Sequence, residues 1–517
     1  MEKDFVSNLW AEMDAEKGDL IDRAEAFSRW TVAAIMPPDG GDNVEQIHGN
    51  VPNGARLVNH LANRIVDVLF PVSRPFFTVA LTPETRLSLE QELGEDEAGK
   101  MQEQIQGATA RLEEVALRKL RLTEYRPVAI MAAKHLIVTG NSILRRMPTG
   151  ERVLYPVNRY CLRRDLLGNE VEVVLSDKKM LSTFDDETRE LIEDRKPETK
   201  PEDVVELFTY YKRDGERWSV KQEADGIHLD NDTHQNNEDY DLLVLDWSLH
   251  PGEHYARGLV EENATLFHTV DVSNEAISDL TAIIADVKFF VRPGSPLAAD
   301  LAALNAAARG TYWPGNADDI SVPDMKARAD LSALIELVAR REAELDRIFL
   351  MSNVRDAERV TAEEIRMLAN ELESSFGGLY SQLAQKWQQK EADYAISKID
   401  FATEIGALGD SFEVLVTTGL ESLSREGQID NLRLAIGDLT MMEAVPEELR
   451  AAFNPLRFAK FVFTNRSVDL SAFLNTKEEM EANRQNELAQ AGRLEDEAAT
   501  RDVATYAGKA AADKAQT

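Results

Sequence analysis

The sequence is almost free of cysteine and has no long apolar run. Cys161 is the single cysteine among 517 residues, so an intrachain disulfide and a cysteine-rich zinc site are excluded. No stretch reaches the roughly 18 apolar residues of a membrane-spanning helix, and the N-terminus has no basic leader followed by an apolar core. We therefore expect a protein that works in water in a reducing compartment, without export, with Cys161 buried as a small apolar residue.

Basic residues are also few relative to acidic ones. The chain has 58 Lys and Arg against 92 Asp and Glu, which gives a net charge of −34. Such a chain repels phosphates, so a broad grip on duplex DNA, as in a groove-reading transcription factor, is excluded. A hydrophobic fraction of 43% is ordinary for a folded protein, and the length allows about three or four domains.

Recognisable catalytic motifs are missing as well. Residues 94–101 come close to a phosphate-binding loop, but Met101 stands where the motif needs Ser or Thr, and acidic residues occupy the loop. The acidic clusters at 185–194 and 478–497 have no apolar surroundings and are typical of solvated helix faces. These segments predict no enzyme activity and no cofactor.

The segment from His250 to His254 has the letters of an inverted zinc-protease motif. That motif requires both histidines on one face of a helix, and Pro251 with Gly252 breaks such a helix. The segment therefore predicts a turn with surface histidines and no metal site. The alternative is a metal-dependent hydrolase that uses His250, Glu253 and His254.

Helical periodicity covers much of the first half of the chain and gives way to a region of period two. Apolar residues recur at helical spacing over 5–35, 57–69 and 84–139, and a strand is expected at 76–81. Six short segments rich in Val, Leu and Tyr predict a mostly antiparallel β region. They are 142–147, 152–157, 170–175, 203–212, 217–223 and 240–247. The polar stretch 231–239 is expected to be a loop tip.

Two long helices follow the β region with a compact insert between them. The 3/4 spacing of apolar residues predicts helices over 258–288 and 325–351. The insert, 289–324, begins with the strand-like FFVRP and contains several Gly and Pro residues. We therefore expect a small module carried between two antiparallel helices.

A third long helix, 361–395, carries two local signals. Thr361 and Glu364 form a capping box at its start, and Gly377-Gly378 predicts a kink or a close backbone approach within it. The chain is helical again after about residue 430 and ends in an Ala/Glu/Gln-rich tail, 476–517. The fold class that these segments predict is α+β, mainly α.

The residues around the third helix resemble a known family. Residues 359–366, RVTAEEIR, with Glu371-Leu372-Glu373, Gly377-Gly378 and Tyr380, resemble the head-to-tail connector, or portal protein, of short-tailed podoviruses. Further matches in the same order are Gly54-Ala55-Arg56, Leu61-Ala62, Leu69-Phe70-Pro71, Gly140-Asn141, Arg164-Asp165, Gly168-Asn169 and Thr418-Gly419-Leu420-Glu421. The resemblance therefore covers residues 50 to 440, and the tail after 476 departs from the family pattern.

The resemblance implies a phage portal fold with wing, stem, clip and crown regions. Twelve subunits would form a ring around a channel at one capsid vertex, through which the genome is packaged and ejected. The implied regions are 1–257 for the N-terminal helices and α/β wing, 258–288 and 325–351 for the stem helices, 289–324 for the clip, 352–360 for the tunnel loop, 361–429 for the long kinked wing helix and its return, and 430–517 for the crown and C-terminal tail.

The resemblance also implies partners and a location. The partners are further copies of the chain in a homo-dodecamer, double-stranded DNA in the channel, a terminase packaging ATPase, tail or adaptor proteins, and scaffolding and major capsid proteins, with no membrane. The location is the virion, at the capsid vertex, after assembly in the host cytoplasm. Carboxylates that line part of the channel would repel phosphates and let the duplex slide. The alternative is another structural or scaffold-like virion protein without a DNA channel.

The candidate DNA contacts lie in the tunnel loop. By resemblance, Arg355 and Arg359 are the positive charges nearest the passing phosphates. The alternative is that they pair with Asp356, Glu358 or carboxylates of a neighbouring subunit and only hold the loop.

The candidate protein contacts lie in the clip and the stem. Tyr312 and Trp313 are expected on the partner-facing surface of the clip, because aromatic residues supply large contact area at low entropic cost. Trp313 could equally belong to the core of the clip. The stem stripes need more partner surface than one thin subunit supplies, which favours a closed ring. The apolar residues expected to pack the stem and ring are Leu280, Ile284, Leu334 and Val338.

Overall fold

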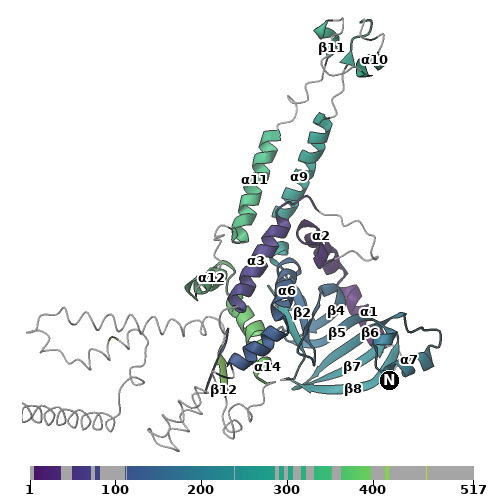
Figure 1. The fold of residues 1–517 in the computed structure, drawn as a ribbon, viewed down its shortest axis with the longest axis vertical. Coiled ribbons are helices and arrows are strands. Elements are labelled where there is room, and N and C mark those ends of the chain that lie inside the picture. The colour runs from purple at the N-terminus through teal and green to yellow at the C-terminus, as the bar shows by residue number, and fades with distance from the viewer. Residues whose placement is uncertain are drawn as a thin grey trace, which may run out of the picture. The chain divides into compact units, whose positions relative to one another are not determined.

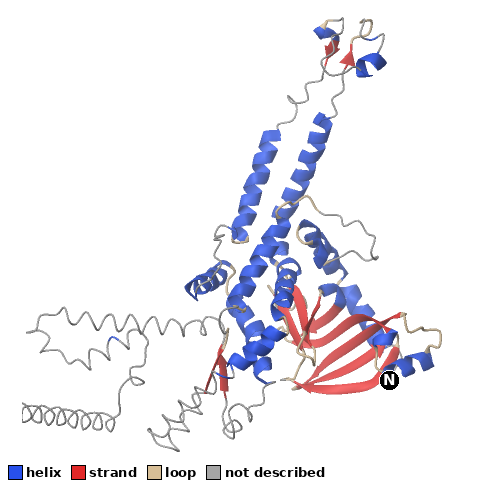
Figure 2. Cartoon of the chain, viewed as in Figure 1, coloured by secondary structure: helices blue, strands red, loops and turns tan. Residues whose placement is uncertain are grey.

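In the computed structural model, Met1–Leu423 form one compact unit and Ser424–Thr517 a second. The residues that the structure describes are 5–36, 49–71, 76–81, 111, 113–237, 239–285, 290–295, 298, 301–306, 316–321, 331–351, 362–397, 414–417 and 462. In the first unit they form the mixed helix and strand fold that the sequence predicts, shown in Figure 1 and, by secondary structure, in Figure 2.

The elements of the first unit are named by their labels in Figure 1. The helices are α1 (Phe5–Glu16), α2 (Gly18–Trp30), α3 (Gly54–Leu69), α6 (Tyr125–Thr139), α7 (Asp186–Arg195), α8 (Leu259–Glu262), α9 (Ala264–Ala285), α10 (Leu301–Ala306), α11 (Leu331–Ile348), α12 (Ala362–Ser375), α13 (Leu379–Leu383) and α14 (Lys390–Ser397). The strands are β1 (Thr78–Leu81), β2 (Asn141–Arg146), β3 (Arg152–Tyr155), β4 (Tyr160–Arg164), β5 (Glu170–Met180), β6 (Val204–Asp214), β7 (Arg217–Ala224), β8 (Ile227–Asn236), β9 (Leu242–Asp246), β10 (Phe290–Val291), β11 (Ile320–Ser321) and β12 (Val414–Thr417).

The larger sheet has five antiparallel strands in the order β4-β5-β6-β7-β8. Along β6, Phe208 and Tyr210 share an apolar cluster with Met13 of α1, whereas Leu207 packs in a cluster with Ile192 of α7. Because successive side chains of a strand point to opposite faces, α1 and α7 cover opposite faces of this sheet. The period-two pattern of the sequence thus corresponds to a sheet buried on both sides.

Helices α3 and α6 pack against each other in the main core, beside the three-stranded sheet β3-β2-β9. Leu57, Leu61, Ile65 and Leu69, spaced four residues apart, are all buried along α3. The helix predicted at 57–69 is therefore confirmed, and its apolar stripe is a core stripe.

The predicted pair of long helices is also present. α9 and α11 run side by side in opposite directions (Figure 1). In the insert between them, β10 and β11 form a small antiparallel ladder, and Arg292 donates its backbone N–H to the carbonyl of Asp319 at 2.9 Å. The strand-like FFVRP is thus a strand at Phe290 and Val291.

The third long helix is broken where the sequence predicts a kink. α12 ends at Ser375, and Gly377 and Gly378 follow with φ of +59° and +95°, which a residue with a Cβ adopts only with strain. α13, a π-helical turn over Ala384–Gln389 and α14 continue the segment. The capping box at Thr361 lies outside the described residues.

The helical pattern over 5–35 forms two helices because Lys17 turns inward between them. Its buried ammonium donates to the carbonyl oxygens of Val157 at 3.1 Å and Tyr160 at 2.7 Å, and pairs with Asp14 at 3.0 Å. A buried amine is stable only when its donors are satisfied in this way. Those acceptors are about 140 positions away in the sequence, so spacing alone could not reveal the break.

The expectation of a loop tip at 231–239 is wrong for most of that stretch. β8 continues to Asn236, which is paired with Arg217 of β7, and His234 is paired with Ser219. β8 ends the order of strands in its sheet, so its polar side chains stay in water while its backbone completes the ladder. A polar edge strand has no apolar pattern, so the sequence did not predict β8.

Three further strands, β4, β11 and β12, were not indicated by the sequence pattern. β4 pairs with β5, and β12 pairs with β1, placing Thr78 opposite Thr417. The strand expected at 76–81 is confirmed as β1. Of the helix expected at 84–139, the structure describes α6 and helical residues at 113–122, separated by Glu124 with φ of +47°.

His135 of α6 gives the main core a dependence on pH. The residue is 4% exposed, and burial lowers its pKa from 6.5 to about 4 because apolar surroundings disfavour the charged ring. Below about pH 6.5 the unfolded chain binds a proton here and the folded chain does not, so stability is lost as the pH falls towards 4. We expect this residue to cost about 3 kcal/mol of unfolding free energy between pH 7 and pH 4.

Urea unfolding of the wild type and of His135→Leu at several pH values checks this expectation. The variant keeps a buried side chain of similar size but has no proton to bind. Carboxylates titrate in both proteins alike, so the stability of the variant should fall less steeply with pH. Equal slopes in the two proteins would show that His135 does not titrate as described.

Candidate functional site

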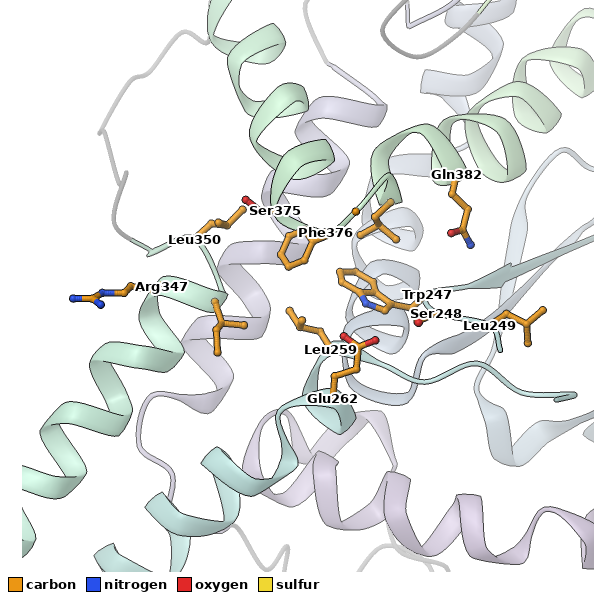
Figure 3. A pocket seen from close by; sticks show the side chains of 13 residues that line it. Trp247, Ser248, Leu249, Leu259, Glu262, Arg347, Leu350, Ser375, Phe376 and Gln382 are labelled. Atoms are coloured by element: carbon orange, nitrogen blue, oxygen red, sulfur yellow. The ribbon is translucent and has the colours of Figure 1, made fainter. Parts of the chain in front are cut away.

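The candidate site is a pocket at the base of the α9–α11 pair. Its volume is about 720 Å³, and its walls come from the end of β9, α8, the end of α11 and the α12–α13 junction. Figure 3 shows Trp247 and Phe376 meeting at the centre, with Leu259 and Glu262 below them. The two aromatic rings pack edge to face with centroids 5.5 Å apart. We call this feature the base pocket.

The start of the helix pair is fixed by the turn between α6 and β2. Gly140 has φ of +76°, and a Cβ there would lie 2.5 Å from the backbone carbon of Arg257, so no other residue fits. Asn141 donates its side-chain amide to the carbonyl of Ala256 at 2.7 Å and accepts the backbone N–H of the same residue at 2.8 Å. The chain entering α8 is therefore held rigidly against the main core.

The end of α11 carries a strained residue. Phe349 is buried against Phe267 of α9, with ring centroids 5.9 Å apart. The next residue, Leu350, has φ of +55°, a left-handed conformation that costs a non-glycine residue roughly 1–2 kcal/mol. The helix thus stops abruptly at the wall of the base pocket.

A buried carboxylate joins the helical segment after the kink to β9. Asp246 accepts from the ammonium of Lys386 at 2.8 Å, from the side-chain amide of Gln382 at 2.8 Å and from the guanidinium of Arg164 at 3.4 Å. Hydrogen bonds to a charged group are stronger than neutral ones. This cluster therefore fixes α13, whose Leu379 and Gln382 supply one wall of the base pocket.

A second buried carboxylate, Glu391 of α14, joins the same segment to β2 and β3. It accepts from Arg152 at 2.6 Å and from Arg146 at 3.4 Å, and both guanidinium groups lie over the ring of Tyr394. Burial alone would lower the pKa of Arg152, but the charge of Glu391 raises it. Burial, followed by the charge of Glu391, raises the pKa of Tyr125 well above its usual value, so this tyrosine stays neutral.

The surface charge of the helix pair is acidic. α9 contains Asp271, Glu275 and Asp279 and no Lys or Arg. Glu275 and Asp279 are exposed, and Asp271 accepts from the indole N–H of Trp30 at 3.0 Å. On α11, Arg340 pairs with Glu336 at 2.5 Å and Arg341 with Glu344 at 2.9 Å, whereas the exposed Arg347 lies at the base pocket.

Part of the apolar stripe predicted for ring packing is used within the chain. Val338 is buried in the main core cluster, whereas Leu280 and Leu334 are half-buried. Ile284 lies in α9. Their role between subunits remains a prediction. The stripe did not include Ile335, which is 55% exposed on α11.

The predicted clip and tunnel-loop contacts lie outside the described residues. This holds for Tyr312 and Trp313, and for Arg355 and Arg359. The near-match to a phosphate-binding loop at 94–101 lies outside them as well. The roles of all these residues remain predictions.

The segment from His250 to His254 is a turn, as predicted. His250 is exposed, Glu253 pairs with Arg257 at 2.8 Å, and His254 accepts the backbone N–H of Arg164 at 3.1 Å through Nδ1. Within the part of the chain that the structure describes, no group of three His, Cys, Asp or Glu side chains could hold a metal ion.

Cys161 is a packing residue of the sheet. It lies buried with Val6 and Met13 of α1, and burial raises its pKa to about 11. The thiol is therefore protonated at neutral pH and unreactive. Among the described helices, none is long and apolar enough to span a bilayer.

Comparisons with known proteins extend the resemblance found in the sequence. The family model for bacteriophage head to tail connecting protein matches residues 3–473. The chain is 32% identical over 506 residues to the portal protein of Enterobacteria phage SP6, covering 95% of this chain and 93% of the relative. It is 26% identical over 501 residues to the portal protein of Pseudomonas phage phiKMV, covering 95% and 96%. A solved structure, the neck of an empty GTA particle computed with C6 symmetry, matches with a TM-score of 0.35 and 12% identity over 74% of this chain and 85% of that chain.

Proposed function

This chain belongs to the family of bacteriophage head to tail connecting proteins, and from this premise we propose that twelve copies form a closed ring around a DNA channel at one capsid vertex. The observation that carries the proposal is the extent of the match. It covers residues 3–473 in the family model and almost the full length of two phage portal proteins. The predicted resemblance to portal proteins is thereby confirmed, and the ring and channel are the step that we add.

We assign the regions of the chain by the same reasoning. In this proposal α9 and α11 are the stem, 289–324 is the clip, 352–360 is the tunnel loop, 361–429 is the kinked wing helix with its return, and 430–517 is the crown with its tail. The rigid attachment of α8 by Asn141 and the buried clusters at Asp246 and Glu391 support a stem mounted on a stiff wing. A channel through which DNA is driven under load needs a stem whose position relative to the wing is fixed.

The charge distribution supports a channel that does not hold DNA tightly. α9 carries three carboxylates and no cation, and the exposed Arg340 of α11 is paired with Glu336 of its own helix. Such a lining would repel phosphates and keep the duplex from sticking. Isolated positive residues would then act singly on the passing DNA.

The relatives are structural portal proteins, and we propose a structural role here too. ATP hydrolysis for packaging would be supplied by a separate terminase. The other proposed partners are tail or adaptor proteins on the clip and scaffolding and major capsid proteins around the wing, in a virion assembled in the host cytoplasm.

We expect Arg355→Ala combined with Arg359→Ala to lower the amount of DNA packaged or retained. Each arginine would neutralise one phosphate at a time, so their loss removes the positive contacts of the tunnel loop. The measurement is the DNA content of purified particles. Wild-type DNA content in the double variant would remove the phosphate-contact role and leave the loop-holding alternative.

A matched control separates a general effect of lost charge from an effect at the loop. Arg340→Gln and Arg341→Gln remove two cations from α11 that are paired within that helix. Particles with this pair of changes should hold normal amounts of DNA. Particle number and ring mass should be unchanged in the control, because Arg340 and Arg341 pair with carboxylates of their own helix. The same two measurements on the Arg355→Ala/Arg359→Ala variant separate a loss of DNA from a loss of assembly.

A further inference from the structure

We propose that Arg64 of α3 is a positioning residue that ties the end of α11 to α12, the two helices that flank the segment 352–361. The inference rests on the proposed function only for the importance of the segment 352–361. The contacts of Arg64 with the two flanking helices do not depend on that function. No local sequence pattern marks Arg64.

Arg64 joins the two helices that flank the segment. Its Nη1 donates to the backbone carbonyl of Leu350, just after α11, at 2.6 Å. Its Nη2 donates to the carboxylate of Glu371 on α12 at 3.2 Å. One planar guanidinium therefore connects the end of α11 with α12.

The environment of Arg64 makes these contacts strong. The residue is 9% exposed, so water does not compete well for its donors and the charge is not screened. His60, one turn earlier on α3, has a lowered pKa because of burial and then because of the positive charge of Arg64. The neighbouring imidazole therefore stays neutral at pH 7. It lies close enough to the carbonyl of Leu350 to interact with it, but it adds no second positive charge beside the Glu371 carboxylate.

The base pocket makes the connection difficult to replace. Leu350 lies on one wall of this pocket, and Ser375 and Phe376 at the end of α12 lie on another. Between these walls lies a pocket of about 720 Å³. The two walls therefore lack the apolar contacts with which a packed core would hold them together. Leu350 is also strained, with φ of +55°, and the hydrogen bond from Arg64 to its carbonyl oxygen holds it in that conformation.

Arg56 provides a natural comparison on the same helix. It pairs with Asp346 of α11 at 3.5 Å; the Arg56 side chain is exposed, and Asp346 is half-buried. Arg56 thus pairs with the helix before the segment and not with α12, and an ion pair with an exposed partner contributes little. A difference in behaviour between variants at Arg64 and variants at Arg56 therefore shows the effect of connecting α11 to α12.

Limited trypsin digestion of the full-length protein tests the proposal, because Arg355 and Arg359 are cleavage sites inside the segment. We expect Arg64→Met to be cut after these residues about tenfold faster than the wild type. We expect cleavage to follow the population of molecules in which the end of α11 has separated from α12. A hydrogen bond to a charged group changes such an equilibrium by about tenfold or more. Glu371→Gln and Arg64→Lys should accelerate cleavage by a smaller factor, and Arg56→Met should match the wild type.

The outcomes separate the anchoring from the proposed function. Wild-type cleavage rates after Arg355 and Arg359 in folded Arg64→Met would overturn the inference. If circular dichroism shows that this variant is misfolded, unchanged rates in both Glu371→Gln and Arg64→Lys would overturn it instead. A wild-type protein that forms no ring by native mass would contradict the proposed function, while the comparison of cleavage rates would still decide on Arg64.

Discussion

Replacing Glu391 by alanine is expected to lower the free energy of unfolding by about 3–5 kcal/mol, because the change leaves two buried cations without their counter-charge. Glu391 is fully buried, at 0% exposed, and the guanidinium groups of Arg146 and Arg152 that it accepts from are buried as well. Their remaining contacts are backbone carbonyls and the faces of Tyr394 and Tyr125. None of these contacts carries a negative charge. The charge of Arg146 also acts on the carboxylate of Asp393, so Arg152 is the cation that depends most on Glu391.

Chemical unfolding of the wild type, Glu391→Ala and Glu391→Gln measures this effect. The glutamine variant keeps the volume and one acceptor, so it should lose less stability than the alanine variant. Glu12→Ala is the matched control, because Glu12 also pairs with an arginine, Arg163, at 2.7 Å but is exposed. That change should cost less than about 1 kcal/mol. Equal costs for Glu391→Ala and Glu12→Ala would show that the buried cluster does not stabilise the fold.

The variant Ile335→Asp is expected to abolish the ring and leave the single chain folded. Ile335 is more than half exposed on α11, so an aspartate there costs the isolated subunit little. In the proposed ring the α9–α11 pairs of neighbouring subunits would pack together, and the change would bury an unpaired charge at a cost of several kcal/mol. Cyclic symmetry repeats that cost at each interface, so assembly should be lost completely.

Native mass and circular dichroism together measure the outcome for Ile335→Asp. Arg340→Gln is the control, because this exposed cation of the same helix pairs within the helix and its loss should leave the ring intact. Val338→Asp should behave differently from both and destabilise the chain itself, since Val338 is buried within the subunit. Rings of normal mass formed by Ile335→Asp would show that this face of α11 is not an interface.

The elements that the sequence predicted well are those whose burial follows a simple period. The stripe of α3 and the 3/4 spacing of α9 and α11 each have one buried face. The kink at Gly377-Gly378 was predictable because two adjacent glycines signal a backbone that other residues avoid. By contrast, β8 is polar and lies at a sheet edge, so neither periodicity nor apolar content marks it.

The candidate site was far less accessible from the sequence. Glu391 and its partner Arg152 are 239 positions apart, and Arg64 and Glu371 are 307 apart. A buried ion pair of this kind has no local signature, because an isolated Glu or Arg in a helical pattern is usually on the surface. Ile335 was missed for the opposite reason, since it lies outside the apolar stripe that packs within the chain.

An electron micrograph of the purified full-length protein is the most direct test of the ring and its channel. End-on views should show a closed ring of twelve subunits, each of 57.9 kDa, around a central opening wide enough for duplex DNA. A field of monomers at micromolar concentration, or closed particles without a central opening, would contradict it.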